Sequence, residues 1–318
     1  MTINTLTLRL RMRLLLEQIK AGWQQRDYFI RHDETFLIAS YRAYLQREPD
    51  KSVRNSYLGH SGQGTMSRRA LLDGIWQSTE FRMRWGLTPM PFAALHTTRT
   101  WLIQEQLPPA DVIVDLGGAA SGQPEGAILS LGYPHVPTEL MIIDLPVDKR
   151  LGNWDPNEPH TLITENGTRV RYIYGSMADL HMIGDSSVDL VFSGESIEHV
   201  SEADAERTIR EAWRVLKPGG YFCLDTPNGA LTRLQSPNEF IHPEHQKEYL
   251  VSELVEKVQT VGFVVEDKKA ICPMPRSLAT GQFDASEMAE NMFLGDKAEE
   301  GYLFFLKCRK PGTSNKNP

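Results

Sequence analysis

The chain is poor in cysteine, with three in 318 residues. Cys223, Cys272 and Cys308 lie far apart and form no CxxC pair. This spacing argues against a disulfide scaffold and against a cysteine-bound zinc, and it fits a protein kept in a reducing cytoplasm. The sequence also has no apolar run long enough to span a bilayer as a helix.

An excess of positive charge is lacking as well, since the formal net charge is −7. A general nucleic-acid binder usually shows a basic face, so we expect no nucleic-acid partner. Basic residues do gather in the first segment, MTINTLTLRLRMRLLLEQI, where Arg9, Arg11 and Arg13 stand among leucines. We expect an amphipathic helix that packs on its own protein, and the alternative is weak contact with an anionic membrane surface.

Three regions of the chain differ in pattern. Spaced apolar residues with charges between them predict a small all-α domain over residues 1–88. From 89 to 310, short β-rich runs alternate with helical segments, which predicts an α/β domain with a parallel sheet and helices on both faces. The polar tail 311–318, PGTSNKNP, is expected to be disordered.

The first region contains FLIASYRAYLQREPDKSVRNSYLGHSGQGTMSRRALLDGIWQSTEFR, which reads as three helices separated by two turns. This stretch resembles a small bacterial helical domain of unknown function. The matching residues are Tyr41, Leu45, Arg47, Pro49, Asp50, Ser67, Arg68, Ser78, Glu80 and Phe81. Such domains often accompany surface proteins and glycan-modifying enzymes. The resemblance therefore suggests a role in glycan modification, but it does not indicate which reaction the chain catalyses.

The stretch VIVDLGGAASGQPEG, residues 112–126, reads as a strand followed by a turn of small residues. In an open parallel sheet, ligands bind beyond the carboxyl ends of the strands, and small residues let the backbone approach a ligand closely. Read as GxAxxG, Gly117, Ala119 and Gly122 form a dinucleotide fingerprint. Read as DxGxAxS from Asp115, the same turn binds S-adenosylmethionine. The turn alone does not choose between these cofactors.

The sequence after this turn favours S-adenosylmethionine over a dinucleotide. The segment YGSMADLHMIGDSSVDLVFSGESIEHVSEADAERTIREAWRVLKPGGYFCLDTPN resembles class I S-adenosylmethionine-dependent methyltransferases, within a resemblance that spans about 110–310. The resemblance implies a Rossmann-like seven-stranded sheet in the order 3-2-1-4-5-7-6 and S-adenosyl-L-methionine as cofactor. The implied cofactor-binding residues are Asp115, Gly117, Gly118, Ala119, Asp144, Leu145, Ser176, Met177 and Gly194.

The resemblance also implies which part of the cofactor each of these residues binds. Asp144 accepts both ribose hydroxyls, Ser176 and Met177 flank the adenine, and Gly194 lies near the homocysteine end. The family usually has an acidic residue at the position of Ser176. Asp179 or backbone groups are therefore the alternative hydrogen-bond partners of the adenine amino group. The alanine at 119 and the serine at 121 each add a Cβ where close approach is expected, which lowers the expected affinity.

The stretch GESIEHV places two glutamates and a histidine close together, and FIHPEHQKEY adds His242 and His245. On a helical turn, residues three and four apart share a face. The pattern resembles the metal-dependent O-methyltransferases that act on small-RNA 3′ ends and on ubiquinone precursors. This resemblance implies the metal ligands Glu195, Glu198, His199 and His245. Carboxylates and imidazoles suit Mg²⁺, Mn²⁺ or Zn²⁺, and a bound divalent ion lowers the pKa of a coordinated hydroxyl.

One alternative at this site is His199 as a general base without any metal, with Glu198 paired to a basic side chain. The other is His199 as a hydrogen-bonded residue that only shapes the pocket. His199 and Glu198 are the candidate catalytic residues. The insert at about 274–297 carries Met288 in an amphipathic pattern, and we expect a short helix packed on the sheet edge in preference to a substrate lid.

The expected protein is a cytoplasmic O-methyltransferase whose acceptor is a sugar hydroxyl of a bacterial glycan or lipid-linked saccharide. One alternative is O-methylation of a small natural product or quinone precursor. The non-enzyme alternative is an inactive methyltransferase fold that serves as a binding module.

Overall fold

The computed structural model describes residues 33–58, 68–78, 81, 91–120, 122–146 and 160–312. The chain divides into two compact units, Met1–Phe81 and Arg82–Pro318. The predicted boundary at 88/89, the predicted basic N-terminal helix and residues 313–318 of the tail lie outside the described residues and stay predictions. Within the described ranges, every helix is too short or too polar to cross a membrane.

Three helices make up the described part of the first unit, as the sequence predicts. They are α2 (Asp33–Leu45), α3 (Lys51–Leu58) and α4 (Arg68–Gln77). The predicted break after α2 occurs at Pro49 and Asp50, and Asp50 Oδ1 accepts a hydrogen bond from the Val53 backbone N–H at 2.8 Å at the start of α3. The rings of Tyr44 and Phe81 are buried and meet edge to face at 6.1 Å.

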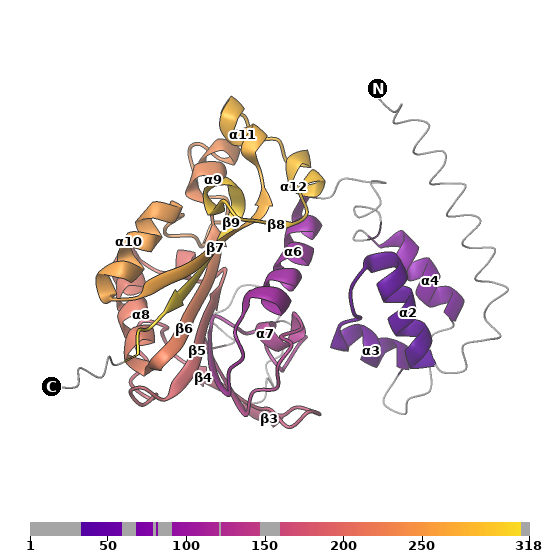
Figure 1. Cartoon of the computed structure of the whole chain (residues 1–318), viewed down its shortest axis with the longest axis horizontal. Helices are drawn as coiled ribbons and strands as arrows, with labels where there is room; N and C mark the ends of the chain where they lie inside the picture. Colours follow the sequence, from indigo (N-terminus) through magenta and orange to yellow (C-terminus); the bar gives the residue numbers. More distant parts are fainter. Residues whose placement is uncertain are drawn as a thin grey trace. The chain divides into compact units, whose positions relative to one another are not determined.

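The second unit is built on one mixed sheet with the strand order β3-β4-β2-β1-β5-β6-β9-β7-β8 (Figure 1). The neighbours from β4 through β6 in this order are parallel, and all other pairs are antiparallel. The strands are β1 (Val112–Leu116), β2 (Glu139–Asp144), β3 (Thr161–Ile163), β4 (Arg169–Tyr174), β5 (Val188–Gly194), β6 (Leu216–Pro227), β7 (Val264–Pro273), β8 (Leu294–Gly295) and β9 (Gly301–Arg309).

Helices cover both faces of this sheet. They are α6 (Pro91–Gln106), α7 (Ala127–Ser130), α8 (Glu202–Val215), α9 (Gly229–Gln235), α10 (Val251–Val261), α11 (Pro275–Thr280) and α12 (Ser286–Glu290), with the 3-10 turns η2 (Ile197–His199) and η3 (Ala298–Glu300). In Figure 1, α8 and α10 lie on one side of the strands and α6 and α7 on the other.

Two hydrophobic layers explain why the strands form. In β1, Ile113 packs in the layer that includes α6 and α7, and the next residue, Val114, packs in the layer that includes α8 and α10. Leu190 and Val191 of β5 divide in the same way, and all four are 0% exposed. Burying one such side chain contributes about 1.5–3 kcal/mol. These central strands therefore hold their carboxyl ends at one fixed edge.

The expected α/β fold is confirmed, but the expected number of strands is wrong. The seven inner strands keep the expected order 3-2-1-4-5-7-6, and two short antiparallel strands, β3 and β8, extend the sheet to nine. The strand β3 forms a hairpin with β4 across a turn in which Gly167 has a φ of +91°. β3 has three residues and β8 has two, which is too short for an alternation of apolar and polar residues to be recognised in the sequence. Both strands are defined by their hydrogen bonds to the neighbouring strand.

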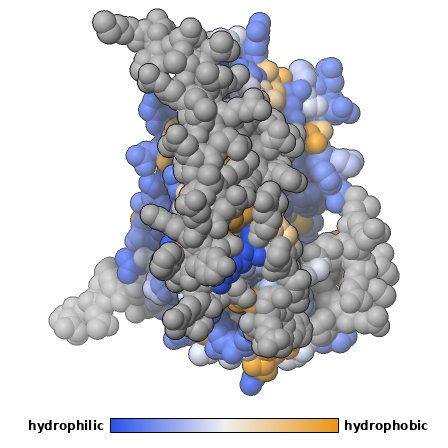
Figure 2. All heavy atoms as spheres, turned by 90° about the vertical axis from the view of Figure 1, so that its right-hand side faces the viewer, coloured by the Kyte–Doolittle hydropathy of each residue, from blue (hydrophilic) through white to orange (hydrophobic). Residues whose placement is uncertain are grey.

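The insert before β9 forms two short helices, α11 and α12, and the edge strand β8, where one short helix was expected. Met288 of α12 is 0% exposed and belongs to the hydrophobic layer that includes α6. Phe293, which follows α12, is 49% exposed. On the face shown in Figure 2, the described surface is mostly hydrophilic and the hydrophobic side chains form small separate spots.

Candidate cofactor and catalytic site

The chain turns after β1 where two glycines stand in positions with no room for a side chain. Gly117 has a φ of +72°, and its backbone N–H donates to Ile143 O at 2.8 Å. A Cβ on Gly117 would lie 2.7 Å from Ser196 Cβ, and one on Gly118 would lie 2.2 Å from Asp115 Cγ. Packing within the chain therefore requires glycine at both positions, before any ligand is considered.

Asp115 lies under this turn and is 1% exposed. Burial raises the pKa of its carboxyl group to about 7, partly offset by a backbone hydrogen bond from Ile128. Its Oδ2 atom is buried and has no hydrogen-bond partner within the described part of the chain. An unpaired buried acceptor costs about 1–3 kcal/mol. A ligand that brought a hydrogen-bond donor to this oxygen would remove that cost.

Asp144 ends β2 and reaches into the same turn. Its Oδ2 accepts a hydrogen bond from the Ala119 backbone N–H at 3.0 Å, and its Oδ1 accepts one from the Leu145 backbone N–H at 2.7 Å. Leu145 is 48% exposed and presents an apolar surface beside the carboxylate. At one edge of the sheet, the structure thus brings together the predicted residues Asp115, Gly117, Gly118, Ala119, Asp144 and Leu145. Ser121 lies outside the described residues.

The residues predicted to flank adenine follow β4. The Gly175 backbone N–H donates to Asp144 O at 3.0 Å, so the end of β4 is held beside the end of β2. Ser176 is exposed and Met177 is half-buried. Asp179, the alternative partner for adenine, is exposed, and its Oδ1 lies 2.9 Å from His181 Nδ1. Ser176 and Met177 therefore directly follow a residue that is hydrogen-bonded to the backbone of Asp144.

The end of β5 is held by a buried ion-pair network. Arg99 of α6 donates from Nε to Asp225 Oδ2 at 2.7 Å, and its Nη1 lies 2.5 Å from Glu195 Oε2. The side chain of Arg99 is 13% exposed and that of Asp225 is fully buried. A Cβ on Gly194 would lie 2.8 Å from Arg99 Nη2. Glu195 itself has a φ of +49°, a value that few residues other than glycine adopt, and it points to Arg99.

Glu198, on the turn η2, is fully buried. Its Oε2 accepts a hydrogen bond from Thr226 Oγ1 at 2.9 Å, and its Oε1 is buried without a partner among the described residues. Burial, with a smaller contribution from the charge of Glu195, raises the pKa of Glu198 to about 8. The group therefore carries a proton at neutral pH. The expectation that Glu198 pairs with a basic side chain is wrong, because its partner is the hydroxyl of Thr226.

Three imidazoles gather beside η2. Each of His199, His242 and His245 offers a ring nitrogen, and these nitrogens all lie within 4.8 Å of one another. Burial lowers the pKa of His199, and the neighbouring His245 and His242 lower it further, so the ring is neutral at pH 7 and has a free lone pair. His245 Nδ1 lies 2.8 Å from Glu248 Oε1, and both residues are nearly buried.

The four predicted metal ligands do not converge in this structure. His199 and His245 lie together as expected, but the third member of the cluster is His242, and neither glutamate belongs to it. The reason lies in the backbone, because η2 is a single 3-10 turn that follows the positive φ of Glu195. Glu195 therefore lies before the helical turn and pairs with Arg99, so the ExxEH spacing does not bring its members to one face.

Sequence reasoning missed Arg99, Asp225 and Glu248. Arg99 and Asp225 are 126 positions apart, so no local pattern joins them. The Glu248 contact had a signal, since His245 and Glu248 stand three apart in HQKE.

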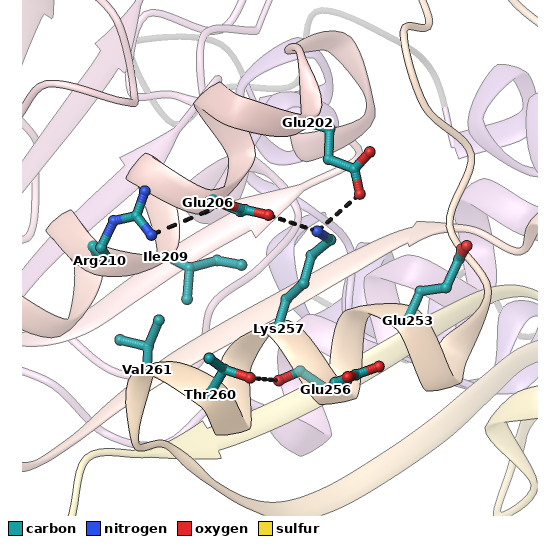
Figure 3. A pocket seen from close by; sticks show the side chains of 9 residues that line it. All are labelled: Glu202, Glu206, Ile209, Arg210, Glu253, Glu256, Lys257, Thr260 and Val261. Carbon is teal, nitrogen blue, oxygen red and sulfur yellow. Dashed lines mark hydrogen bonds and ion pairs between the residues drawn. The ribbon is translucent and has the colours of Figure 1, made fainter.

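A separate cavity of about 360 Å³ opens between α8 and α10 (Figure 3). Four glutamates, Arg210 and Lys257 line it, and Lys257 Nζ lies 2.8 Å from Glu202 Oε1 and 2.9 Å from Glu206 Oε1. None of the predicted site residues lines it. We therefore assign this cavity no ligand.

Two family models match the chain. Residues 154–224 match the family described as a methyltransferase domain, and residues 25–85 match a domain of unknown function, DUF4214. The first match includes the stretch from Glu195 to His199, and the second covers the predicted N-terminal resemblance. The predictions of a methyltransferase domain and of a helical domain of unknown function are thereby confirmed. The more specific O-methyltransferase subtype stays a prediction.

Curated relatives match about a third of the chain. A probable S-adenosylmethionine-dependent methyltransferase of Mycolicibacterium smegmatis is 38% identical over 99 residues, which are 31% of this chain and 37% of the relative. One of Mycobacterium tuberculosis is 34% identical over 96 residues, 30% of this chain and 34% of the relative. The chain thus spans about a third of the length of these relatives. Together with the family match, they support an enzyme.

A solved S-adenosylmethionine-dependent methyltransferase of Mesorhizobium loti superimposes with a TM-score of 0.42 at 15% identity, over 69% of this chain and 100% of that one. The assignment of the fold rests on the strand order described above and not on this similarity.

Proposed function

We propose that the chain is an S-adenosylmethionine-dependent O-methyltransferase. One observation carries the cofactor part of this proposal. The turn after β1 presents an unpartnered buried carboxyl oxygen of Asp115 and the carboxylate of Asp144 at one edge of the sheet. The methyltransferase-domain match and the curated relatives support the same cofactor.

The residues at this edge fit S-adenosylmethionine. Asp144 can accept hydrogen bonds from a ribose diol, and the exposed Leu145 beside it offers an apolar surface to adenine. Asp115 Oδ2 can accept a hydrogen bond from the ammonium group of the methionine portion, and ionisation of Asp115 would strengthen that bond. When bound, the cofactor supplies an electrophilic methyl group.

The acceptor hydroxyl is activated at His199. This ring is half-buried and neutral at pH 7, so it can take a proton from a hydroxyl group as the oxygen attacks. Glu198 is protonated next to it in sequence, with Oε1 unpaired, and can donate a hydrogen bond to an acceptor oxygen. The pair therefore supplies one base and one hydrogen-bond donor.

The acceptor class follows from the N-terminal unit. The DUF4214 match and the resemblance to domains that accompany glycan-modifying enzymes support a saccharide hydroxyl on a glycan or lipid-linked saccharide. This is an argument from domain context and not from the site.

The test supplies methyl-labelled S-adenosylmethionine to the purified chain with three acceptor pools: lipid-linked saccharides, soluble glycans, and phenolic quinone precursors. We expect label in a saccharide methyl ether and its loss in His199→Ala, with cofactor binding retained. Label in a phenolic quinone precursor would show that the acceptor is a phenol and not a saccharide. A chain that binds no cofactor would favour the binding-module alternative.

A further inference from the structure

The cluster of His199, His242 and His245 has the composition of a transition-metal site. The rings of His199 and His245 have centroids 4.8 Å apart, and those of His242 and His245 are 5.4 Å apart. One nitrogen from each ring lies within 4.8 Å of the other two. Three imidazoles with one open position form a known donor set for a divalent zinc-class ion.

The surroundings of His245 orient it as a ligand. Its Nδ1 lies 2.8 Å from the Glu248 carboxylate, so the Nδ1–H tautomer is favoured and the lone pair stays on Nε2. Glu248 is 3% exposed and also accepts a hydrogen bond from the Ile241 backbone N–H at 2.9 Å. A histidine held by a buried carboxylate is the arrangement that supports metal-bound imidazoles in proteins.

The two glutamates of the ExxEH pattern point elsewhere. Glu195 is paired with Arg99 at 2.5 Å, and Glu198 accepts a hydrogen bond from Thr226. A site without carboxylates selects ions that prefer imidazole nitrogen, and it disfavours Mg²⁺, which prefers oxygen ligands.

We propose that His199, His242 and His245 bind one Zn²⁺ ion, with His242 in the place expected for a glutamate. Zinc–nitrogen bonds of about 2.1 Å at tetrahedral angles put the nitrogens about 3.4 Å apart. Nitrogens as far apart as 4.8 Å must therefore approach by roughly 1.4 Å, which ring rotation can supply. His242 must also give up the hydrogen bond that its Nδ1 accepts from the Glu244 backbone N–H at 3.2 Å.

Zinc bound at this site would occupy the lone pair that the proposed function gives to His199 as a base. With the ion bound, coordination to zinc would lower the pKa of the acceptor hydroxyl in place of His199, and this role rests on the proposed function. The site lies directly after β5, next to the turn that carries Glu198. Binding of the ion itself does not depend on methyl transfer, so it can be measured directly.

The experiment uses the full chain without a histidine tag, freed of metal by a chelator and then dialysed against Zn²⁺, with metal counted by mass spectrometry. Co²⁺ gives a second readout, because a four-coordinate site absorbs strongly in the visible range. The variants are His242→Ala, Glu195→Gln and, as a matched control, His181→Ala, whose exposed ring pairs with Asp179. His242 is exposed, so its removal leaves the fold intact.

We expect one Zn²⁺ per chain, with affinity at least about tenfold weaker in His242→Ala and unchanged in Glu195→Gln and His181→Ala. Excess Mg²⁺ should not displace the ion. The proposal is overturned if no Zn²⁺ binds, if His242→Ala binds as tightly as the wild type, or if Glu195→Gln or Mg²⁺ removes the ion. S-adenosylmethionine binding in the same preparation separates the two proposals. Cofactor binding without zinc overturns only the metal site, and zinc without cofactor binding overturns only the methyltransferase.

Discussion

The substitution Asp115→Asn isolates the cost of burying a charge under the turn after β1. Asparagine has the size of aspartate but cannot ionise. Asp115 is 1% exposed, so the surrounding chain holds either side chain in the same place. We therefore expect the effect of this substitution on stability to depend on pH.

The size of the effect follows from the pKa of Asp115, which is about 7 in the folded chain against 3.8 for a solvated aspartate. Because the folded-state pKa is raised, the folded chain keeps a proton that the unfolded chain has lost between about pH 4 and about pH 7. The stability of the wild type falls as pH rises through this window, and above the window this group causes no further change with pH. Each pH unit is worth about 1.4 kcal/mol, so the window is worth about 4 kcal/mol.

The assay is urea unfolding of both proteins at about pH 5 and about pH 8. Between these two values, the free energy of unfolding of Asp115→Asn should rise by roughly 3 kcal/mol relative to the wild type. Asp296→Asn is the control, since the Asp296 side chain is 91% exposed and its substitution should show a much smaller pH dependence. A difference between Asp115→Asn and the wild type that is the same at both pH values would refute a buried, protonated Asp115.

Two further substitutions test packing and charge at the same edge. Gly118→Ala should destabilise the chain by at least about 1–3 kcal/mol in urea unfolding, because its Cβ would lie 2.2 Å from Asp115 Cγ. Gly175→Ala, where the nearest atom is 3.9 Å away, should change stability little, and equal effects would contradict the argument. Arg99→Met should cost about 3–5 kcal/mol by leaving buried Asp225 unpaired. The exposed Arg207→Met should cost far less, and a tolerated Arg99→Met would show that the network is dispensable.

The residues that could be predicted from the sequence are those that directly follow a central strand. Asp115, Asp144 and Gly194 lie at the ends of β1, β2 and β5, and parallel strands bring such ends to one edge whatever the loops do. The alternating β and α segments predicted the sheet with helices on both faces, whereas the order of the seven inner strands came from the resemblance to class I methyltransferases. The small edge strands were not, although the Asn166-Gly167 pair before β4 is a hairpin signal.

The side-chain partners could not be predicted where they depend on contacts distant in sequence. Nothing near Arg99 indicates that it binds Asp225, which comes from a strand 126 positions later. The direction of Glu195 depends on one backbone angle, a φ of +49°, that the ExxEH spacing does not reveal. Since that angle turns Glu195 toward Arg99, the metal ligands inferred from spacing and those gathered by the fold differ.

The central claim is that the edge after β1 and β2 binds S-adenosylmethionine. Its most direct test is a calorimetric titration of the folded, ligand-free chain with the cofactor, with Asp144→Ala and the distant Asp296→Ala in parallel. We predict binding by the wild type and by Asp296→Ala. In Asp144→Ala, affinity should be at least about tenfold weaker, because hydrogen bonds to a charged carboxylate are worth about 1.5–3 kcal/mol. Absence of binding by the wild type, or equal binding by Asp144→Ala, would contradict the account.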